Sequence, residues 1–233
     1  HTVYETSTGH EFRFTPEGPV VTEAECRLFR EAAPEVAPRV HALCNGVDAE
    51  FFSPQPERAS PYPADVTPVV FTGAMDYWPN VDAVTWFVQD MLPRLKANWP
   101  QLRFYIVGRS PTPAVKALAG PDVEVTGTVP DVRPYLQHAA VVVAPLRLAR
   151  GIQNKVLEGM AMGAAVVAAR SCVQALQLQP HDGVVAADSL EDYVQAVLRW
   201  LSEPNLARGA GLQARRCIER RFSWESNLQV LDR

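Results

Sequence analysis

The sequence has only four cysteines, and they lie far apart. Cys26, Cys44, Cys172 and Cys217 form no C-x-x-C pair. A metal site requires clustered ligands, and a disulfide-stabilised scaffold requires a higher cysteine density. We therefore expect reduced cysteines in a cytoplasmic protein, with neither a disulfide framework nor a cysteine-bound metal.

Long apolar runs and charge runs of one sign are also missing. The apolar stretches have the length of strands, far below the ~18–20 residues that cross a bilayer. The formal net charge is −4, with no basic run that would indicate nucleic acid and no acidic tail. Nucleic acid is therefore not an expected partner. The chain begins with His1 rather than Met, and we expect it to be a piece of a longer protein.

Two glycine-rich phosphate-binding motifs are absent. No G-x-G-x-x-G follows an apolar run, which argues against a dinucleotide cofactor. No G-x-x-x-x-G-K-[ST] is present, which argues against an ATPase or GTPase. We expect no cofactor.

Between residue 66 and about residue 200, short apolar runs alternate with amphipathic helical segments. The expected strands are residues 68–72, 103–107, 123–126, 141–144, 165–169 and 184–187. The expected helices are residues 81–98, 113–118, 132–138, 152–162 and 190–202. Strands that are apolar on both faces and separated by helices predict a parallel sheet covered on both sides. Right-handed crossovers then give an α/β fold with a doubly wound, Rossmann-like sheet of about six strands.

The flanking regions lack this alternation. Their expected contents are a helix at residues 22–32, an extended piece at 40–43, a turn at Asn45-Gly46, and two helices within 204–233 that break near Phe222. Proline is dense from residue 53 to residue 65. Such density disfavours helix and central strand, and it predicts a linker there.

Glycines follow the expected strands at the edge where a parallel sheet binds its ligand. Gly73, Gly108 and Gly127 end three strands, and Gly151 precedes the fourth main helix. Glycine at such a turn permits positive φ and close approach of a ligand to the backbone. One glycine is weak evidence because tight turns need glycine anyway, but four on one edge favour a ligand crevice.

The segment 145–163 runs from a strand through a loop into a helix. Its free backbone N–H groups at residues 152–155 would point into the crevice from the helix N-terminus, which carries about half a positive charge. Arg147, Arg150 and Lys155 add full charges near the same point. This combination predicts that a diphosphate binds there.

Glu158 lies on the same side of this helix as Asn154 and Lys155, by the i,i+3 and i,i+4 spacing. Its carboxylate would accept hydrogen bonds from two neighbouring hydroxyls, as a ribose presents them. The alternative is a surface ion pair between Lys155 and Glu158, worth about a few tenths of a kcal/mol. The spacing alone does not choose between the two.

Residues 151–163, G-I-Q-N-K-V-L-E-G-M-A-M-G, carry a family resemblance. They are similar to the donor-site helix of the retaining GT-B glycosyltransferases of family 4, which typically reads E-G-F-G-x-x-x-L-E-A-M-A-x-G. Residues 45–54 resemble the N-G-V-D-x-x-x-F-x-P segment of the same family. The glycines and flanking residues at 70–73, 105–108 and 126–129 resemble its strand ends, less specifically. The resemblance covers roughly residues 40–225.

The resemblance implies two Rossmann-like domains facing across a cleft. The nucleotide-sugar donor would bind mainly to the C-terminal one, and a saccharide or lipid-linked acceptor to the other. The expected parts are a remnant of the N-terminal domain in 1–52, a linker in 53–65, the donor-binding domain in 66–203 and C-terminal helices in 204–233. The implied activity is retaining, metal-independent glycosyl transfer in the cytoplasm or at the inner face of the cell membrane. Any peripheral membrane association would belong to the missing half.

Roles follow from the resemblance position by position. Glu158 matches the glutamate that holds the nucleotide ribose, which favours that role over the ion pair, and Val129 matches the loop that lines the nucleobase. The amides that meet the diphosphate correspond to Ile152, Gln153, Asn154 and Lys155. The other expected donor-site residues are Gly73, Arg109, Arg147 and Gly151. The expected catalytic residues are Arg150, Lys155 and Glu158.

Two departures from the family pattern affect the donor. The first glutamate of the family, which contacts the donor sugar, falls on Arg150, and an arginine there suits a donor carboxylate or a phosphate contact. The basic pair that the family has after its first strand is absent from residues 73–80, so Arg109, Arg147, Arg150 or Lys155 would supply that charge. R-G-x-Q-N-K before L-E resembles most closely a bacterial exopolysaccharide-associated subgroup of sugar transferases.

Two other functions fit parts of the pattern. A GT-B nucleotide-sugar epimerase would use acid and base residues from both domains, but the helix motif favours transfer. A non-catalytic nucleotide-sugar-binding module is compatible with the missing first glutamate. Donor hydrolysis or transfer by the full-length protein would exclude the module.

Overall fold

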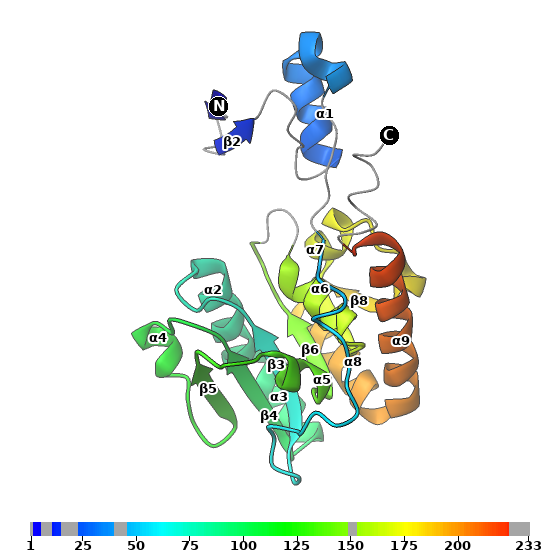
Figure 1. The fold of residues 1–233 in the computed structure, drawn as a ribbon. Coiled ribbons are helices and arrows are strands. Elements are labelled where there is room, and N and C mark those ends of the chain that lie inside the picture. The colour runs from blue at the N-terminus through cyan, green and yellow to red at the C-terminus, as the bar shows by residue number, and fades with distance from the viewer. Residues whose placement is uncertain (1, 6–10, 15–22, 40–45, 149–152, 224–233) are drawn as a thin grey trace.

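The main unit of the protein is an open parallel sheet. The computed structural model describes residues 2–5, 11–14, 23–39, 46–148 and 153–223. Six parallel strands lie in the order β5-β4-β3-β6-β7-β8 (Figure 1). They are β3 (Thr67–Thr72), β4 (Leu102–Val107), β5 (Val123–Gly127), β6 (Val141–Ala144), β7 (Val166–Ala169) and β8 (Val184–Ala187). The predicted Rossmann-like α/β fold is confirmed, and each expected strand matches within one residue at either end.

Two helical groups cover the sheet. One group consists of α2 (Trp78–Trp86), η2 (Phe87–Met91), α3 (Leu92–Asn98), α4 (Pro113–Lys116) and α8 (Leu190–Ser202). The other consists of α5 (Arg133–Gln137), α6 (Asn154–Ala161) and α9 (Pro204–Arg221). The short helix α7 (Arg170–Ala175) lies against β7 and β8. A helix precedes or follows every strand of the sheet, as a doubly wound topology requires.

Alternate residues of the central strands pack against different layers. Phe71 and Phe104 belong to the larger core, where Phe87 stacks on Phe104 with ring centroids 4.1 Å apart. Val70 and Tyr105 are buried in a separate cluster, because successive strand residues point to opposite faces. Burying a large apolar side chain fully contributes about 1.5–3 kcal/mol, so both clusters stabilise the sheet.

The proline-rich segment 53–65 contains neither helix nor strand and is bound to α5. The Tyr62 hydroxyl donates to the Tyr135 carbonyl oxygen at 2.6 Å, and the Tyr62 ring packs edge-on to Tyr105 with centroids 4.6 Å apart. The side-chain oxygen of Gln137 accepts from the backbone N–H of Gln55 at 3.0 Å. The segment therefore covers the smaller apolar cluster where no long helix does so.

The helix expected at residues 81–98 is not one regular α-helix. The chain stays helical, but it passes from α2 through the π-helical segment η2 into α3. Pro93 lies in the first turn of α3. Proline has no N–H, and its ring clashes with the carbonyl four residues earlier, so a regular α-helix cannot run through it. A π-helical turn is one way to absorb such a break.

A small group of elements precedes the main unit. It consists of the antiparallel pair β1 (Thr2–Glu5) and β2 (Glu11–Phe14), α1 (Glu23–Ala32) and η1 (Pro34–Arg39). The helix expected at 22–32 corresponds to α1, whereas the β1–β2 pair and α7 were not predicted. The extended piece expected at 40–43, residue Asn45 and the second C-terminal helix lie outside the described residues.

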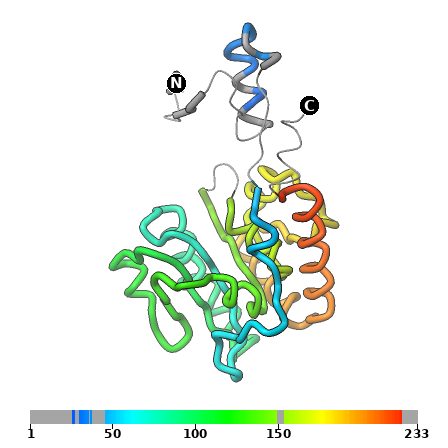
Figure 2. The backbone as a smooth tube through the Cα atoms, viewed as in Figure 1, coloured from blue at the N-terminus to red at the C-terminus, as the bar shows by residue number. Residues whose placement is uncertain are grey.

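Helix α9 packs along α6 and joins the ends of the main unit. The Arg215 guanidinium donates to the carbonyl oxygens of Phe52 at 2.7 Å, Ala161 at 2.5 Å and Ala49 at 3.1 Å. The Val47 N–H donates to the carbonyl oxygen of Phe222 at 2.8 Å, and Val47 and Ser223 form a parallel bridge. Figure 2 shows the two chain segments meeting beside the end of α9. The chain therefore enters and leaves this unit at one place.

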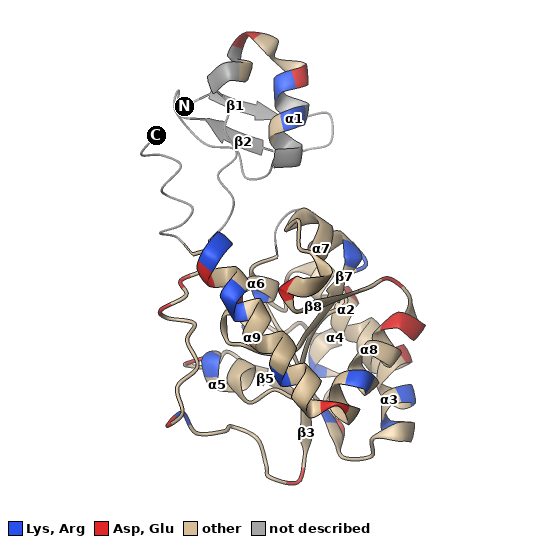
Figure 3. Cartoon of the chain, turned by 90° about the vertical axis from the view of Figure 1, so that its right-hand side faces the viewer, with Lys and Arg blue, Asp and Glu red and all other residues tan. Residues whose placement is uncertain are grey.

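Acidic and basic residues are interspersed over the outer helices (Figure 3). The Arg94–Glu191 pair links α3 to α8 at 3.4 Å, with both side chains more than half exposed. An exposed pair of this kind contributes about 0–1 kcal/mol, so the buried core dominates stability. Within the ranges that the structure describes, no helix is both long enough and apolar enough to cross a membrane.

Candidate functional site

The candidate site lies where the strand order of the sheet reverses. The chain builds outward from β3 to β4 and β5, then returns to place β6 on the other side of β3. In open parallel sheets, ligands bind beyond the carboxyl ends of the strands at this switch point. The loop that follows β3 and the loop that leads from β6 into α6 both leave the sheet there.

Three strand ends are joined by backbone hydrogen bonds. The N–H of Gly73 donates to the Val107 carbonyl oxygen at 3.0 Å, and the N–H of Gly108 donates to that of Gly127 at 3.2 Å. A β-carbon on Gly108 would lie 1.7 Å from the Gly73 carbonyl oxygen. These glycines therefore have a packing role of their own, whether or not a ligand also approaches them.

Lys155 extends from the first turn of α6 to the end of β3. Its Nζ donates to Asn80 Oδ1 at 3.0 Å and to Gln153 Oε1 at 3.4 Å, and it lies 5.2 Å from the centre of the Phe71 ring. A β-carbon on Gly73 would lie 3.3 Å from Lys155 Cε. Burial lowers the pKa of Lys155, while the nearby Glu158 carboxylate raises it. A cation thus lies at the strand end where this chain has no Lys or Arg in residues 73–80.

Asn80 is a site residue that the sequence analysis did not identify. It belongs to the first turn of α2 and is 3% exposed. Its Nδ2 donates to the Ala74 carbonyl oxygen at 2.8 Å, while its Oδ1 accepts from Lys155. The one available signal is a polar residue beside Trp78-Pro79 at a helix start, and this does not indicate burial. Only the folded arrangement shows that it joins the loop after β3 to Lys155 on α6.

Glu158 lies one turn after Lys155 and is partly buried. Burial raises the pKa of its carboxyl group, and the Lys155 charge opposes that rise. Among the described residues, its carboxylate makes no hydrogen bond and no salt bridge. The group is therefore partly desolvated and keeps its acceptor capacity, which fits a ligand hydroxyl better than a surface ion pair.

The start of α6 is held close to the sheet. A β-carbon on Gly159 would lie 3.3 Å from both Val142 Cγ1 and Val166 Cγ2, so the helix rests directly on β6 and β7. Gln153 is the N-cap residue, but its side chain makes no capping hydrogen bond. The first amides of the helix are those of Asn154 and Lys155, and the N-terminal end of a helix attracts anions.

Arg147 is placed differently from Lys155. Its guanidinium pairs with the Asp82 carboxylate, with Nε 3.0 Å from Oδ2, and lies 5.2 Å from the centre of the Trp86 ring. Asp82 and Asn80 are two residues apart on α2, and residues at this spacing do not face the same way. The structure therefore brings Arg147 and Lys155 to different sides of α2.

Two further predicted donor-site residues, Arg109 and Val129, follow the strand ends at the same edge. Arg109 is exposed in the loop after β4, and its carbonyl oxygen accepts from the Met75 N–H at 2.8 Å. Val129 packs against the Val70 and Tyr105 cluster. Arg150, Gly151 and Ile152 lie outside the described residues, so their predicted roles remain expectations. Within the described ranges, no three His, Cys, Asp or Glu side chains lie close enough to hold a metal ion.

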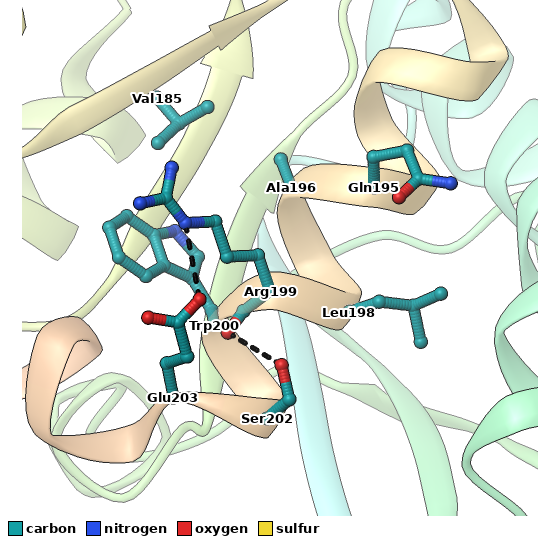
Figure 4. A pocket seen from close by; sticks show the side chains of 8 residues that line it. All are labelled: Val185, Gln195, Ala196, Leu198, Arg199, Trp200, Ser202 and Glu203. Atoms are coloured by element: carbon teal, nitrogen blue, oxygen red, sulfur yellow. Dashed lines mark hydrogen bonds and ion pairs between the residues drawn. The ribbon is translucent and has the colours of Figure 1, made fainter.

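A separate hollow of about 490 Å³ is lined by residues of β8 and of the end of α8 (Figure 4). Its lining includes Val185, near the start of β8, and Arg199, Trp200 and Glu203 at the end of α8. Because α8 runs back from the carboxyl end of β8, its last turn lies at the amino ends of the strands. The hollow is therefore remote from Lys155 and Glu158 and forms no part of the candidate site.

Comparison with known protein families identifies one match. Residues 67–203, more than half of the chain, match the family described as Glycosyl transferases group 1. No curated protein matches the chain.

Solved structures share the fold. A glycosyltransferase from Rickettsia africae is similar with a TM-score of 0.74 at 16% identity, over 91% of this chain and 61% of that one. Sucrose-phosphate synthase from Thermosynechococcus elongatus gives 0.70 at 19% identity, over 92% and 56%. Anabaena HepE in complex with UDP-glucose gives 0.72 at 15% identity, over 94% and 64%. The chain thus spans less than two thirds of each of these proteins.

Proposed function

We propose, since this chain belongs to the Glycosyl transferases group 1 family, that it is the donor-binding part of a glycosyltransferase. The full-length protein would transfer a glycosyl group from a nucleoside diphosphate sugar to a saccharide or lipid-linked acceptor. The complex of Anabaena HepE with UDP-glucose supports this choice of donor class. The acceptor side, and any contact with the inner face of the cell membrane, would belong to the part of the protein outside this chain.

The observation that carries the proposal is the position of Lys155. Its ammonium group lies beside the end of β3, and α6 begins at the same switch point. Together these supply an ammonium group and a helix N-terminus, which stabilises an anion by about 0.3–2 kcal/mol. A diphosphate is an anion whose size and charge suit both.

The chemistry follows from the leaving group. When the glycosyl bond breaks, negative charge grows on the diphosphate, and groups placed in advance at that point lower the barrier. In this proposal Lys155 and the α6 amides take that role, without a metal ion or a cofactor beyond the donor. Transfer would proceed with retention at the anomeric carbon.

Glu158 would bind the ribose. Its carboxylate is partly buried, and burial raises its pKa, so the charged form lacks the solvation it would have in water. Two ribose hydroxyls would restore hydrogen bonds to it. This arrangement would place the ribose one helical turn from the diphosphate, as a nucleotide lying along α6 requires.

Different regions of the chain would have different roles. Residues 66–203 would bind the donor, 204–233 would pack back across the unit, and 53–65 would connect it to a remnant of the acceptor-side domain in 1–52. Arg150 would meet a phosphate or a carboxylate on the donor. The R-G-x-Q-N-K pattern supports an acceptor from exopolysaccharide synthesis.

Calorimetric titration tests the diphosphate assignment. UDP, GDP, ADP and inorganic pyrophosphate are titrated against the wild type, Lys155→Met and a control, Lys116→Met, on an exposed position of α4. We expect Lys155→Met to weaken binding at least tenfold, which is about 1.4 kcal/mol, and Lys116→Met to leave it unchanged. Equal affinities of the wild type and Lys155→Met would overturn the assignment.

A further inference from the structure

Asn80 is a buried polar residue whose amide is satisfied at both ends. Its Nδ2 donates to the Ala74 carbonyl oxygen at 2.8 Å, and its Oδ1 accepts from Lys155 Nζ at 3.0 Å. The orientation of the amide follows from these partners, because a carbonyl accepts and an ammonium only donates. One side chain therefore links the loop after β3 to the cation on α6.

The contact between Asn80 and Lys155 is also a packing contact. A β-carbon on Gly73 would lie 2.7 Å from Asn80 Nδ2 and 3.3 Å from Lys155 Cε. Because Gly73 has no side chain, it leaves the room in which the Asn80 and Lys155 side chains meet. With Asn80 only 3% exposed, the ammonium is held from one side by a group that cannot move without disturbing the loop.

The chemical nature of the groups that accept hydrogen bonds from Lys155 matters as much as their position. The Asn80 amide is neutral, and so is the second partner of Lys155, Gln153. Neutral acceptors hold an ammonium group without cancelling its charge, whereas a carboxylate in the same place would pair with it. Within the part of the chain that the structure describes, Lys155 is therefore oriented by two neutral hydrogen-bond acceptors and not by an ion pair.

Arg147 provides an internal comparison on the other side of α2. It pairs with the Asp82 carboxylate, two residues after Asn80. The same helix thus presents a neutral partner to one cation and a charged partner to the other. Of these two cations, Lys155 is therefore the one that has no carboxylate partner in a hydrogen bond among the described residues.

We propose that Asn80 is a positioning residue that holds Lys155 through a neutral acceptor where the donor diphosphate binds. This inference rests on the proposed function. Asn80 makes no contact with the diphosphate in this scheme and acts only through Lys155. Its loss should therefore matter only while Lys155 is present.

A double-mutant cycle tests this dependence in the 233-residue chain. Asn80→Asp has nearly the same size but places a carboxylate beside Lys155, and we expect it to weaken binding of UDP and of pyrophosphate at least tenfold. In the Lys155→Met background, the same change should alter affinity less than twofold. Asn98→Asp, an exposed position at the end of α3, is the matched control and should leave affinity unchanged.

The outcomes separate the two proposals. A wild type that binds none of UDP, GDP, ADP or pyrophosphate overturns the proposed function and this inference together. Wild-type affinity in Asn80→Asp, with Lys155→Met still weak, overturns the inference alone. An equal loss in both backgrounds shows a merely structural role and also overturns it. Should Asn80→Asp fail to fold, Asn80→Ser, which introduces no buried charge, takes its place with the same expectation for the cycle.

Discussion

Gly108 lies so close to Gly73 that a β-carbon on it would be 1.7 Å from the Gly73 carbonyl oxygen. We predict that Gly108→Ala forces the two strand ends apart and lowers the free energy of unfolding by about 1–3 kcal/mol, the usual cost of overpacking. The same displacement should weaken UDP binding, because Gly73 packs against Lys155. Urea unfolding and calorimetry measure the two effects.

Gly120→Ala is the control for that prediction. A β-carbon there would meet nothing within 4 Å, so the free energy of unfolding should stay within about 0.5 kcal/mol of the wild type. If Gly108→Ala proved as stable as Gly120→Ala, the close approach of the two strand ends would not exist in solution.

Two glycines of α9 are expected to respond in opposite directions. A β-carbon on Gly209 would meet nothing within 4 Å, and alanine is favoured over glycine within a helix by about 0.8–1.0 kcal/mol. Gly209→Ala should therefore stabilise the protein. Gly211→Ala should destabilise it, because its β-carbon would lie 1.9 Å from the Gly163 carbonyl oxygen. Thermal unfolding of both variants decides, and a change of the same sign in both would contradict the packing of α9 on the loop after α6.

The sequence predicted well those elements whose signal is local. The strands at 141–144 and 184–187 are short apolar runs and were located to the residue. Helix α8 was equally well located, and the structure shows a capping box between Ser189 and Asp192 at its start. The boundaries of such segments can be read from the local sequence, because periodicity and capping act within a few residues.

The sequence did not predict the features that depend on the whole fold. Pro93 shows that a helix must be disturbed, but the position of the π-helical turn depends on packing against α3 and α8. The burial of Asn80 and the pairing of Arg147 with Asp82 join residues 65 to 75 positions apart in the chain. No local pattern encodes these distances, so the sequence left four candidates, Lys155 among them, for the charge at the end of β3.

The pKa of Glu158 predicts how stability changes with pH. Because burial raises its pKa in the folded state above the ordinary value of 4.5, the folded protein binds this proton more tightly than the unfolded chain does. The contribution is fully present below pH 4.5 and is lost as the pH rises through the folded-state pKa.

Glu158→Gln should therefore gain stability relative to the wild type as the pH rises from 4 to 7. Urea unfolding at several pH values, with Glu124→Gln on β5 as the control for an exposed ion-paired carboxylate, measures the difference. A difference between wild type and Glu158→Gln that did not change with pH would show that the Glu158 carboxyl is well solvated.

The thiols of Cys172 and Cys217 should be unreactive in the native protein. Both are buried, and burial raises the pKa of each to about 11. At pH 8 about one thiol in a thousand would then be a thiolate, which is the form that reacts. We predict that iodoacetamide followed by peptide mass spectrometry finds these two residues unlabelled until urea is added. Rapid labelling of Cys172 in native protein would show that α7 opens readily.

The meeting of Val47 with Phe222 and Ser223 has a consequence for engineering. Because the two ends of the unit lie beside each other, a short peptide could join them and new termini could be cut at an exposed turn, such as the one near Gly120. Its first and last described segments are thus neighbours in space. A circularly permuted version that retains the fold and binds the proposed donor would make a small, self-contained sensor for nucleotide sugars.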